Sequence, residues 1–266
     1  MPLAVCATPI GNLEDVTLRV LRELAEADVV LCEDTRHTRK LLERHEVRAR
    51  LFSYHEHNEA RRTAELLPRL EAGERIALVS DAGLPAISDP GARLIVAALA
   101  AGIAVTVLPG ASAVETALVA SGLVAERYQF LGYLPRGERL LLALAEELAR
   151  WPHAAVGFES PQRLRRSLRV LARVIPDRPA AVCRELTKRF EEVERGSVAE
   201  LAERGEGVKG EITLVFGAAE PARPDESAAV SAVAELVTVG VARRQAADLV
   251  ARLTGVSRNR LYRTSL

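Results

Sequence analysis

Short apolar runs alternate with amphipathic segments over the first 121 residues of the chain. The runs carry no helical period, which predicts strands at Leu3–Ala7, Asp28–Cys32, Arg50–Tyr54, Arg75–Ser80 and Ala104–Leu108. Apolar residues recur at helical spacing between them, which predicts helices at Leu18–Ala25, Arg36–Arg44, Glu59–Glu71, Gly91–Ala101 and Ser112–Ser121. Strands that alternate with helices indicate an α/β domain, 1–121, whose mainly parallel sheet is covered on both faces.

The pattern restarts near residue 122 and predicts a second α/β domain over 122–220. Its strands are expected at Tyr128–Leu131, Ala154–Phe158, Ala180–Glu185, Phe190–Gly196 and Gly210–Phe216, and its helices at Leu140–Arg150, Arg163–Val174 and Val198–Arg204. Because the strands cluster toward the end, a mixed sheet is favoured over a parallel one. A proline-containing linker over 219–227 then leads to a small helical tail, 225–266.

Composition limits the classes of function. The chain has 36 basic and 36 acidic side chains, which excludes an overall polycation but not a local basic face. Cys6, Cys32 and Cys183 lie scattered in apolar runs and predict buried free thiols in a reducing compartment. The chain shows neither a secretion signal nor an apolar stretch of ~18 residues, so a cytoplasmic protein without a membrane partner is expected.

Polar segments follow the predicted strands, at the sheet edge where α/β proteins bind ligands. The 79–91 segment has two glycines, two prolines, two aspartates and two serines, and is typical of a rigid, highly specified loop. In the 7–13 segment a turn leads into a helix without the G-x-G-x-x-G pattern of dinucleotide sites. Small residues at 108–113 would let the backbone approach a flat ligand.

Two further segments carry charge and leave alternatives open. At 32–40, Asp34 or Thr35 can cap a helix with a solvated basic face, or the basic residues can bind phosphate. At 54–59, alternation places His55 and His57 on the same side of an extended segment, as in a metal site with Glu56 or Glu59. Without a nearby cysteine or an H-E-x-x-H pattern, a polar loop facing RNA is favoured over a metal site.

Eight stretches resemble, in order and over almost the whole chain, the tetrapyrrole methylase superfamily of S-adenosylmethionine (AdoMet)-dependent enzymes. They are ATPIGNLEDVTL (7–18), CEDTRHTRKLL (32–42), YHEHNE (54–59), VSDAGLPAISDPG (79–91), LPGASAV (108–114), FESPQRL (158–164), RELTKRFEE (184–192) and GEITLV (210–215). The first stretch lacks the GxGxGD usual in tetrapyrrole-type members. CEDTRHT and YHEHNE resemble the ribosomal RNA branch, which methylates the ribose 2′-oxygen of a cytidine in 16S rRNA.

The resemblance implies two α/β domains of the tetrapyrrole methylase type with AdoMet in the cleft between them, no metal, and a homodimer. The implied cofactor-binding residues are Pro9, Asp81, Ala82, Gly83, Leu84, Ile87, Ser112, Ala113, Phe158, Gly210, Glu211 and Ile212. Leu84 and Ala86 stand where the family more often has Thr and Gly, and Phe158 where Tyr is common. These departures are expected to alter the shape of the pocket without abolishing binding.

The implied activity is 2′-O-methylation of a decoding-centre cytidine of 16S rRNA within the 30S subunit. A ribose hydroxyl is a poor nucleophile that benefits from a general base or a cation. The unranked candidates are Asp34, His55, Glu56, Glu159, Glu185 and Lys188. The alternatives are a corrin or sirohaem-precursor methyltransferase of the same superfamily, and a non-catalytic RNA-binding relative.

An RNA substrate also predicts basic contact residues. The candidates are Arg36, His37, Arg39, Lys40, Arg163, Arg184, Arg243, Arg244, Arg258 and Arg260. From Val241 to the end, the tail has six arginines against the single acidic residue Asp248. The tail is therefore either an RNA contact or an Arg-rich dimerisation element.

Overall fold

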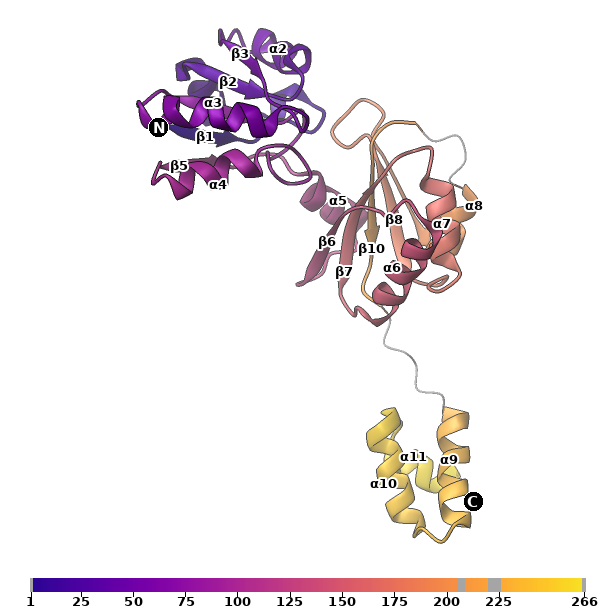
Figure 1. Cartoon of the computed structure of the whole chain (residues 1–266). Coiled ribbons are helices and arrows are strands. Elements are labelled where there is room, and N and C mark those ends of the chain that lie inside the picture. Colours follow the sequence, from indigo (N-terminus) through magenta and orange to yellow (C-terminus); the bar gives the residue numbers. More distant parts are fainter. Residues whose placement is uncertain (1, 205–208, 220–225, 265–266) are drawn as a thin grey trace. The chain divides into compact units, whose positions relative to one another are not determined.

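The computed structural model describes residues 2–204, 209–219 and 226–264. The chain divides into two compact units, 1–219 and 220–266. The first unit holds two five-stranded sheets (Figure 1). The expected fold class is confirmed: two sheets, each covered by helices, are followed by a helical C-terminal part.

All strands of the first sheet are parallel, in the order β3-β2-β4-β1-β5. They are β1 (Leu3–Cys6), β2 (Val29–Cys32), β3 (Leu51–Ser53), β4 (Ile76–Val79) and β5 (Val105–Leu108). Every residue of β1, β2 and β4 is buried, as expected for parallel strands covered on both faces. Their carboxyl ends share one edge of the sheet.

Helices cover both faces of this sheet and explain its two apolar cores. The helices are α1 (Leu18–Glu26), α2 (Thr35–Arg44), α3 (Glu59–Glu71) and α4 (Ala92–Ala100), with a short 3-10 turn, η1, at Leu13–Asp15. One core joins Leu66 of α3 and Leu94 of α4 to the strands, and the other joins Leu24 of α1 and Leu42 of α2. The Thr17 hydroxyl caps α1 by accepting the Val20 N–H at 3.2 Å.

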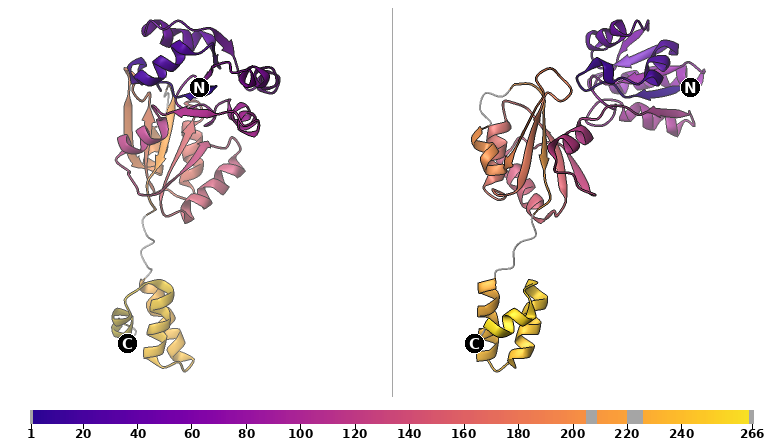
Figure 2. Two further views of the ribbon diagram at one scale, coloured as in Figure 1. Left: turned by 90° about the vertical axis from the view of Figure 1, so that its left-hand side faces the viewer. Right: turned by 180° about the vertical axis from the view of Figure 1, so that it is seen from behind.

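The second sheet is mixed, as the sequence predicted, in the order β6-β7-β10-β8-β9. Its strands are β6 (Tyr128–Tyr133), β7 (Ala154–Glu159), β8 (Pro179–Arg184), β9 (Glu192–Ser197) and β10 (Ile212–Phe216). Only β6 and β7 pair in parallel; the other pairs are antiparallel. Helices α6 (Glu138–Arg150), α7 (Leu164–Ala172) and α8 (Val198–Arg204) pack on one face around a large apolar core (Figure 2).

Helix α5 (Ala113–Ser121) covers the other face of the second sheet. Its Val114, Ala117 and Leu118 share a core with Val156 of β7 and Val215 of β10. The sequence pattern placed this helix at the end of the first domain, because it follows β5 as a further β–α unit. In its packing, α5 therefore belongs with the second sheet.

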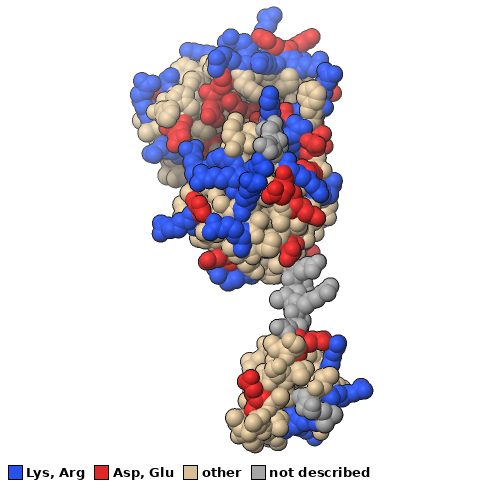
Figure 3. All heavy atoms as spheres, turned by 90° about the vertical axis from the view of Figure 1, so that its right-hand side faces the viewer, with Lys and Arg blue, Asp and Glu red and all other residues tan. Residues whose placement is uncertain are grey.

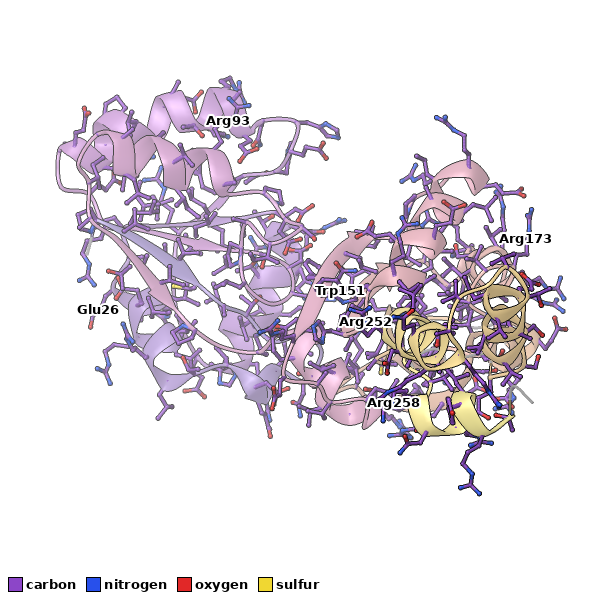
Figure 4. The ribbon with its side chains drawn as sticks, turned by 90° about the horizontal axis from the view of Figure 1, so that it is seen from below. Glu26, Arg93, Trp151, Arg173, Arg252 and Arg258 are labelled. Atoms are coloured by element: carbon purple, nitrogen blue, oxygen red, sulfur yellow. The ribbon has the colours of Figure 1, made fainter. Side chains whose placement is uncertain are left out.

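The second unit is a three-helix bundle formed by α9 (Glu226–Thr238), α10 (Arg243–Thr254) and α11 (Arg258–Thr264). Val233, Ala247 and Leu261 form its small core. Arg252 and Arg258 lie on this unit (Figure 4) and line one shallow surface hollow with Asp248. The linker predicted at 219–227 falls mostly on 220–225, outside the described residues. Of the helices in the described ranges, none is long and apolar enough to cross a membrane.

Candidate functional site

Three of the segments that follow strands of the first sheet meet at its carboxyl edge. Thr8 and Gly83 form an isolated antiparallel bridge, with N–H to O distances of 2.8 and 3.1 Å. A Cβ added to Gly83 would lie 3.7 Å from the Ala111 carbonyl oxygen, and one added to Gly110 would lie 2.8 Å from the Ala7 Cβ. The predicted cofactor residues that flank these contacts, such as Pro9 and Ser112, are therefore brought together.

The 80–91 loop has a strained and specified backbone. Ala86 and Ser88 have positive φ angles of 70° and 63°, and Gly91 has a φ of 136°. Such angles are costly for residues with a Cβ, and persist only where the surroundings hold them. Ser80 Oγ donates to the Gly83 carbonyl at 3.2 Å, and the Ala86 N–H donates to the Pro90 carbonyl at 3.3 Å. This geometry explains the density of Gly, Pro, Ser and Asp in the segment.

Glu59, the last residue of YHEHNE, holds the end of this loop. Its Oε1 accepts the N–H groups of Gly91 at 3.1 Å and Arg93 at 3.3 Å, at the start of α4. The hydroxyl of Tyr54, which is buried, donates to the same carboxylate at 3.3 Å and bonds Thr63 at 3.0 Å. A carboxylate at a helix N-terminus is favoured by the helix dipole. Two residues of YHEHNE therefore support the 80–91 loop.

Carboxylates gather around the same loop. Asp81 accepts the Asp34 backbone N–H at 3.2 Å. Burial, followed by the charge of Glu33, raises the pKa of Asp89 to about 6. Burial and the charge of Asp81 likewise raise the pKa of Glu33. These carboxylates make the surroundings of the 80–91 loop negative, which suits a cationic ligand.

The second sheet contributes an aromatic cluster and the polar residues at the start of β10. The Phe158 ring on β7 lies edge-on to Phe130 and Tyr133, with centroids 5.1 and 5.5 Å away. Burial raises the pKa of Tyr133, and the charges of Asp89 and Glu211 raise it further. Tyr133 therefore lies within electrostatic range of both the 80–91 loop and the start of β10.

Two of the predicted catalytic carboxylates are occupied by structural partners. Asp34 caps α2 through the Arg36 N–H at 2.8 Å, and the Arg36 guanidinium pairs with it, which holds the pKa of Asp34 well below its usual range. Glu159 is buried and accepts from the Ser160 N–H, the Arg163 Nε and the Ser167 hydroxyl at 2.7, 2.7 and 2.5 Å. Both carboxylates therefore have structural roles, Asp34 as a helix cap and Glu159 as the centre of a buried hydrogen-bond network.

Lys188 and Glu185 form a network with the predicted cofactor residue Glu211. Lys188 Nζ lies 3.0 Å from Glu185 Oε1 and 2.9 Å from Glu211 Oε2, and the Glu211 N–H donates to Glu185 at 2.9 Å. That backbone bond, together with Lys188, lowers the pKa of Glu185. Burial lowers the pKa of Lys188, but the two carboxylates outweigh it and raise the pKa overall. A cationic Lys188 suits charge stabilisation rather than proton abstraction.

Two of the remaining YHEHNE side chains lie at the surface. Glu56 and His57 are exposed, and His55 is half-buried with a buried Nδ1 that has no hydrogen-bond partner among the described residues. The His55 and His57 ring centroids are 5.8 Å apart. Within the described ranges, no group of three or more His, Cys, Asp or Glu side chains is placed to hold a metal.

The predicted RNA-binding residues differ in their availability. Arg36, His37, Arg39 and Lys40 are exposed along α2, and Arg244 is exposed on α10. Arg163 and Arg184 pair with Glu159 and Glu192. The three other predicted arginines of the bundle contact neighbours within it: Arg243, Arg258 and Arg260. Figure 3 shows Lys and Arg side chains gathered in a band over one face of the first unit.

Two residues of the site, Asp89 and Tyr133, were not among the sequence candidates, and Glu59 was considered only as a possible metal ligand. Asp89 was visible only as part of a loop rich in turn formers, where an aspartate has an ordinary role as a cap. Tyr133 lies outside every motif that the sequence analysis identified. Glu59 read as the first residue of a helix, and its long-range bonds to α4 left no local signal.

The comparisons with known proteins agree with this arrangement. The model of the family described as "Tetrapyrrole (Corrin/Porphyrin) Methylases" matches residues 2–202. A protein of Halalkalibacterium halodurans named "Ribosomal RNA small subunit methyltransferase I" is 42% identical over 98% of this chain and 93% of its own length. A protein of Thermotoga maritima with the same name is 43% identical over 82% of this chain and 99% of its own length.

Among solved structures, the methyltransferase CobJ superposes with a TM-score of 0.65 at 21% identity, over 83% of this chain and 95% of that one. At this identity the likeness concerns the fold alone. The extent of the family match and the identity to the curated relatives are enough to place the protein. The chain belongs to the tetrapyrrole methylase family and groups there with the proteins named ribosomal RNA small subunit methyltransferase I.

Proposed function

We propose that the protein methylates the ribose 2′-oxygen of a decoding-centre cytidine in 16S rRNA, with AdoMet as the methyl donor and the 30S subunit as substrate. The observation that carries the proposal is the near full-length identity to relatives named for the small ribosomal subunit. The site geometry supports the cofactor, and the branch-specific YHEHNE and CEDTRHT segments border it. A cytoplasmic location follows from the substrate.

The residues at the carboxyl edge of the first sheet fit AdoMet. Gly83 and Gly110 let the segments that carry the predicted cofactor residues pack closely against one another. The carboxylates of Asp81, Asp89 and Glu33 complement a positive ligand. Phe158, with its aromatic neighbours, offers an apolar wall. The cofactor supplies a methyl group on a positively charged sulfur, which needs alignment rather than covalent activation.

Asp89 is the carboxylate best suited to accept the proton of the 2′-hydroxyl. A general base works best when its pKa lies near the working pH, and burial raises the pKa of Asp89 to about 6. Asp34 and Glu185 have lowered pKa values, which makes them weaker bases. Lys188, held as a cation by Glu185 and Glu211, can stabilise a developing oxyanion.

The helical C-terminal unit acts, in this proposal, as an accessory RNA contact. The T. maritima relative is matched over 99% of its length by 82% of this chain, a share equal to that of residues 1–219. A protein of that size carries the same name, so the bundle is an addition to the methylase body. Arg244 is exposed on it, beside five other arginines of the basic tail.

The protein is also proposed to be a homodimer. Val96 and Leu99 on α4 are 66% and 58% exposed, and Val107 on the edge strand β5 is 51% exposed. Exposed apolar side chains on neighbouring elements mark surfaces that a partner covers. Light scattering of the purified chain tests this, since a monomer at micromolar concentration contradicts it.

Methyl transfer from labelled AdoMet to 30S subunits that lack the modification, followed by nucleotide mapping, tests the function. We expect one 2′-O-methylcytidine, and a methyl group on a base would refute the reaction. Transfer to a tetrapyrrole but not to 30S would refute the substrate, and calorimetry without AdoMet binding would refute an enzyme altogether. Deletion of residues 225–266 is expected to weaken 30S affinity while AdoMet binding is retained.

A further inference from the structure

The loop between β8 and β9 projects an aromatic side chain from a rigid base. It contains the RELTKRFEE stretch, to which the proposed reaction assigns only Glu185 and Lys188. Phe190 is 66% exposed, whereas the other four phenylalanines of the chain are buried or half-buried. A single exposed apolar residue is ordinary in itself. What distinguishes this one is how its loop is fixed and what lies around it.

The backbone of the loop is held by its own hydrogen bonds. Glu185 and Thr187 have positive φ angles of 50° and 65°. The Lys188 N–H donates to the Glu185 carbonyl at 3.0 Å, and the Glu191 N–H to the Lys188 carbonyl at 3.1 Å. The Thr187 N–H donates to the Glu191 carboxylate at 2.6 Å. The loop is therefore preorganised, which reduces the entropy lost when it binds a ligand.

The segment after β1 fastens the loop from the other side. The Asn12 N–H donates to the Thr187 hydroxyl at 2.9 Å. A Cβ on Gly11 would lie 2.5 Å from Lys188 Cγ and 2.8 Å from the Leu186 carbonyl oxygen, so only glycine allows this approach. Lys188 in turn pairs with Glu211 at the start of β10. The loop is thus anchored to the predicted cofactor residues.

One guanidinium lies near the exposed ring, and a second lines a groove that includes the residues just before it. The Arg189 guanidinium lies 5.6 Å from the Phe190 ring centroid and is exposed, and it forms no ion pair within the described part of the chain. Beside it is an open groove of about 670 Å³, lined by 11–14, Arg44 and 187–189. Arg44 pairs there with Glu14 at 2.6 Å, and both side chains remain more than half exposed. An aromatic face with a neighbouring guanidinium is the arrangement that binds single-stranded nucleic acid.

We infer that Phe190 stacks on a nucleobase of the RNA next to the target nucleotide, and that Arg189 binds the adjoining phosphate. The inference rests on the proposed RNA substrate and adds residues that position it. Sequence-specific RNA recognition uses unpaired bases stacked on aromatic or guanidinium planes. The stacked base would lie beside the groove. The ion pair between Lys188 of the loop and Glu211 would fix the position of the loop, and so of the base, relative to the methyl donor.

Steady-state methylation of 30S subunits by the full chain tests the inference. Loss of one base stack weakens binding by roughly 5- to 150-fold, so Phe190→Ala should raise the KM for 30S by that factor. Its kcat and its Kd for AdoMet should stay within about twofold of the wild type. Phe190→Trp should restore the KM, whereas Phe190→Leu, which is apolar without a π face, should not. Leu140→Ala, at a 53% exposed apolar position on α6, is the matched control.

The charge of Arg189 is tested by salt dependence. Removing one phosphate contact lowers the slope of log affinity against log salt by about 1, which Arg189→Ala should show. An unchanged KM in Phe190→Ala, rescue by leucine as complete as by tryptophan, or loss of dimerisation in that variant would overturn the stacking role. If the wild type methylates 30S, such a result overturns this inference alone. If it does not, the proposed function fails and this inference with it.

Discussion

Replacement of Glu159, one of the candidate catalytic residues, distinguishes a structural role for this side chain from a catalytic one. Glu159 has no exposed side-chain area, and its carboxylate accepts three hydrogen bonds while it pairs with Arg163 at 2.5 Å. Arg163 also donates to the Leu134 carbonyl at 2.6 Å, which links β7 to the end of β6. Glu159→Gln keeps the shape of the side chain and removes its charge. We expect it to lower stability and leave the chemistry of the folded enzyme intact.

The magnitude follows from the contacts. Breaking a buried ion pair costs about 3–5 kcal/mol, and charge-assisted hydrogen bonds are about twice as strong as neutral ones. Glutamine can still accept bonds, and Arg163 is 26% exposed, so its charge is partly solvated. We therefore expect a loss of about 2–4 kcal/mol in the free energy of unfolding. At ~2–4 °C per kcal/mol for a body of this size, the Tm falls by about 4–16 °C.

The Tm of the wild type and of each variant is measured by calorimetry, and their kcat values are measured well below the lowest Tm. Glu138→Gln is the control, because Glu138 and Arg173 form a 2.6 Å pair in which both side chains are more than half exposed. An exposed pair contributes ~1 kcal/mol or less, so the control should melt within a few degrees of the wild type. A Glu159→Gln variant with wild-type Tm and a kcat lowered by 100-fold or more would refute the structural role.

Three further changes probe the other contacts of the site. Glu59→Gln removes the charge that holds Gly91 at the start of α4, so the Kd for AdoMet should rise by about 2- to 30-fold in calorimetry with a small change in Tm. Burial raises the pKa of Asp89 from 3.8 to about 6, so its contribution to stability is full below pH 3.8 and is lost as the pH rises through 6. Asp89→Asn should therefore flatten the fall in Tm between pH 4 and 7, and an unaltered profile would contradict the raised pKa. Gly11→Ala places a Cβ 2.5 Å from Lys188 Cγ and should lower both Tm and 30S methylation, whereas alanine at Gly73, which meets no atom within 4 Å but has a φ of +88°, should cost stability only.

The sheets and most helices could be predicted because their signals are local. Buried parallel strands such as β2 and β4 appear as short apolar runs, and caps such as Thr17 and Asp34 stand one residue before their helices. The convergence of the 7–13, 79–91 and 108–113 segments also followed from the rule that the carboxyl ends of parallel strands share an edge. The family resemblance then assigned a ligand to that edge.

The packing partner of α5 and the role of Glu59 could not be predicted in this way. A β–α pattern continues without interruption through α5, so sequence alone attaches it to the preceding sheet, although Val114 and Leu118 pack against β7 and β10. Glu59 reaches Gly91 and Arg93 across 32 and 34 positions of sequence. Such a contact depends on how α3 and α4 lie side by side, which no local period encodes.

In the YHEHNE segment, some side chains support the 80–91 loop and others are exposed to solvent. Tyr54 and Glu59 face inward and hold the 80–91 loop, while Glu56 and His57 face the solvent. A segment that resembles an RNA-modifying branch can therefore serve in part to shape a neighbouring loop rather than to contact RNA. By the same reasoning the RELTKRFEE segment divides between Lys188, which pairs with Glu211, and Phe190, which is free to meet a substrate. Exchange of the inward residues should change cofactor affinity, and exchange of the outward ones the KM for 30S. A variant of Phe190 that altered AdoMet binding, or of Glu59 that altered only the KM for RNA, would contradict this division.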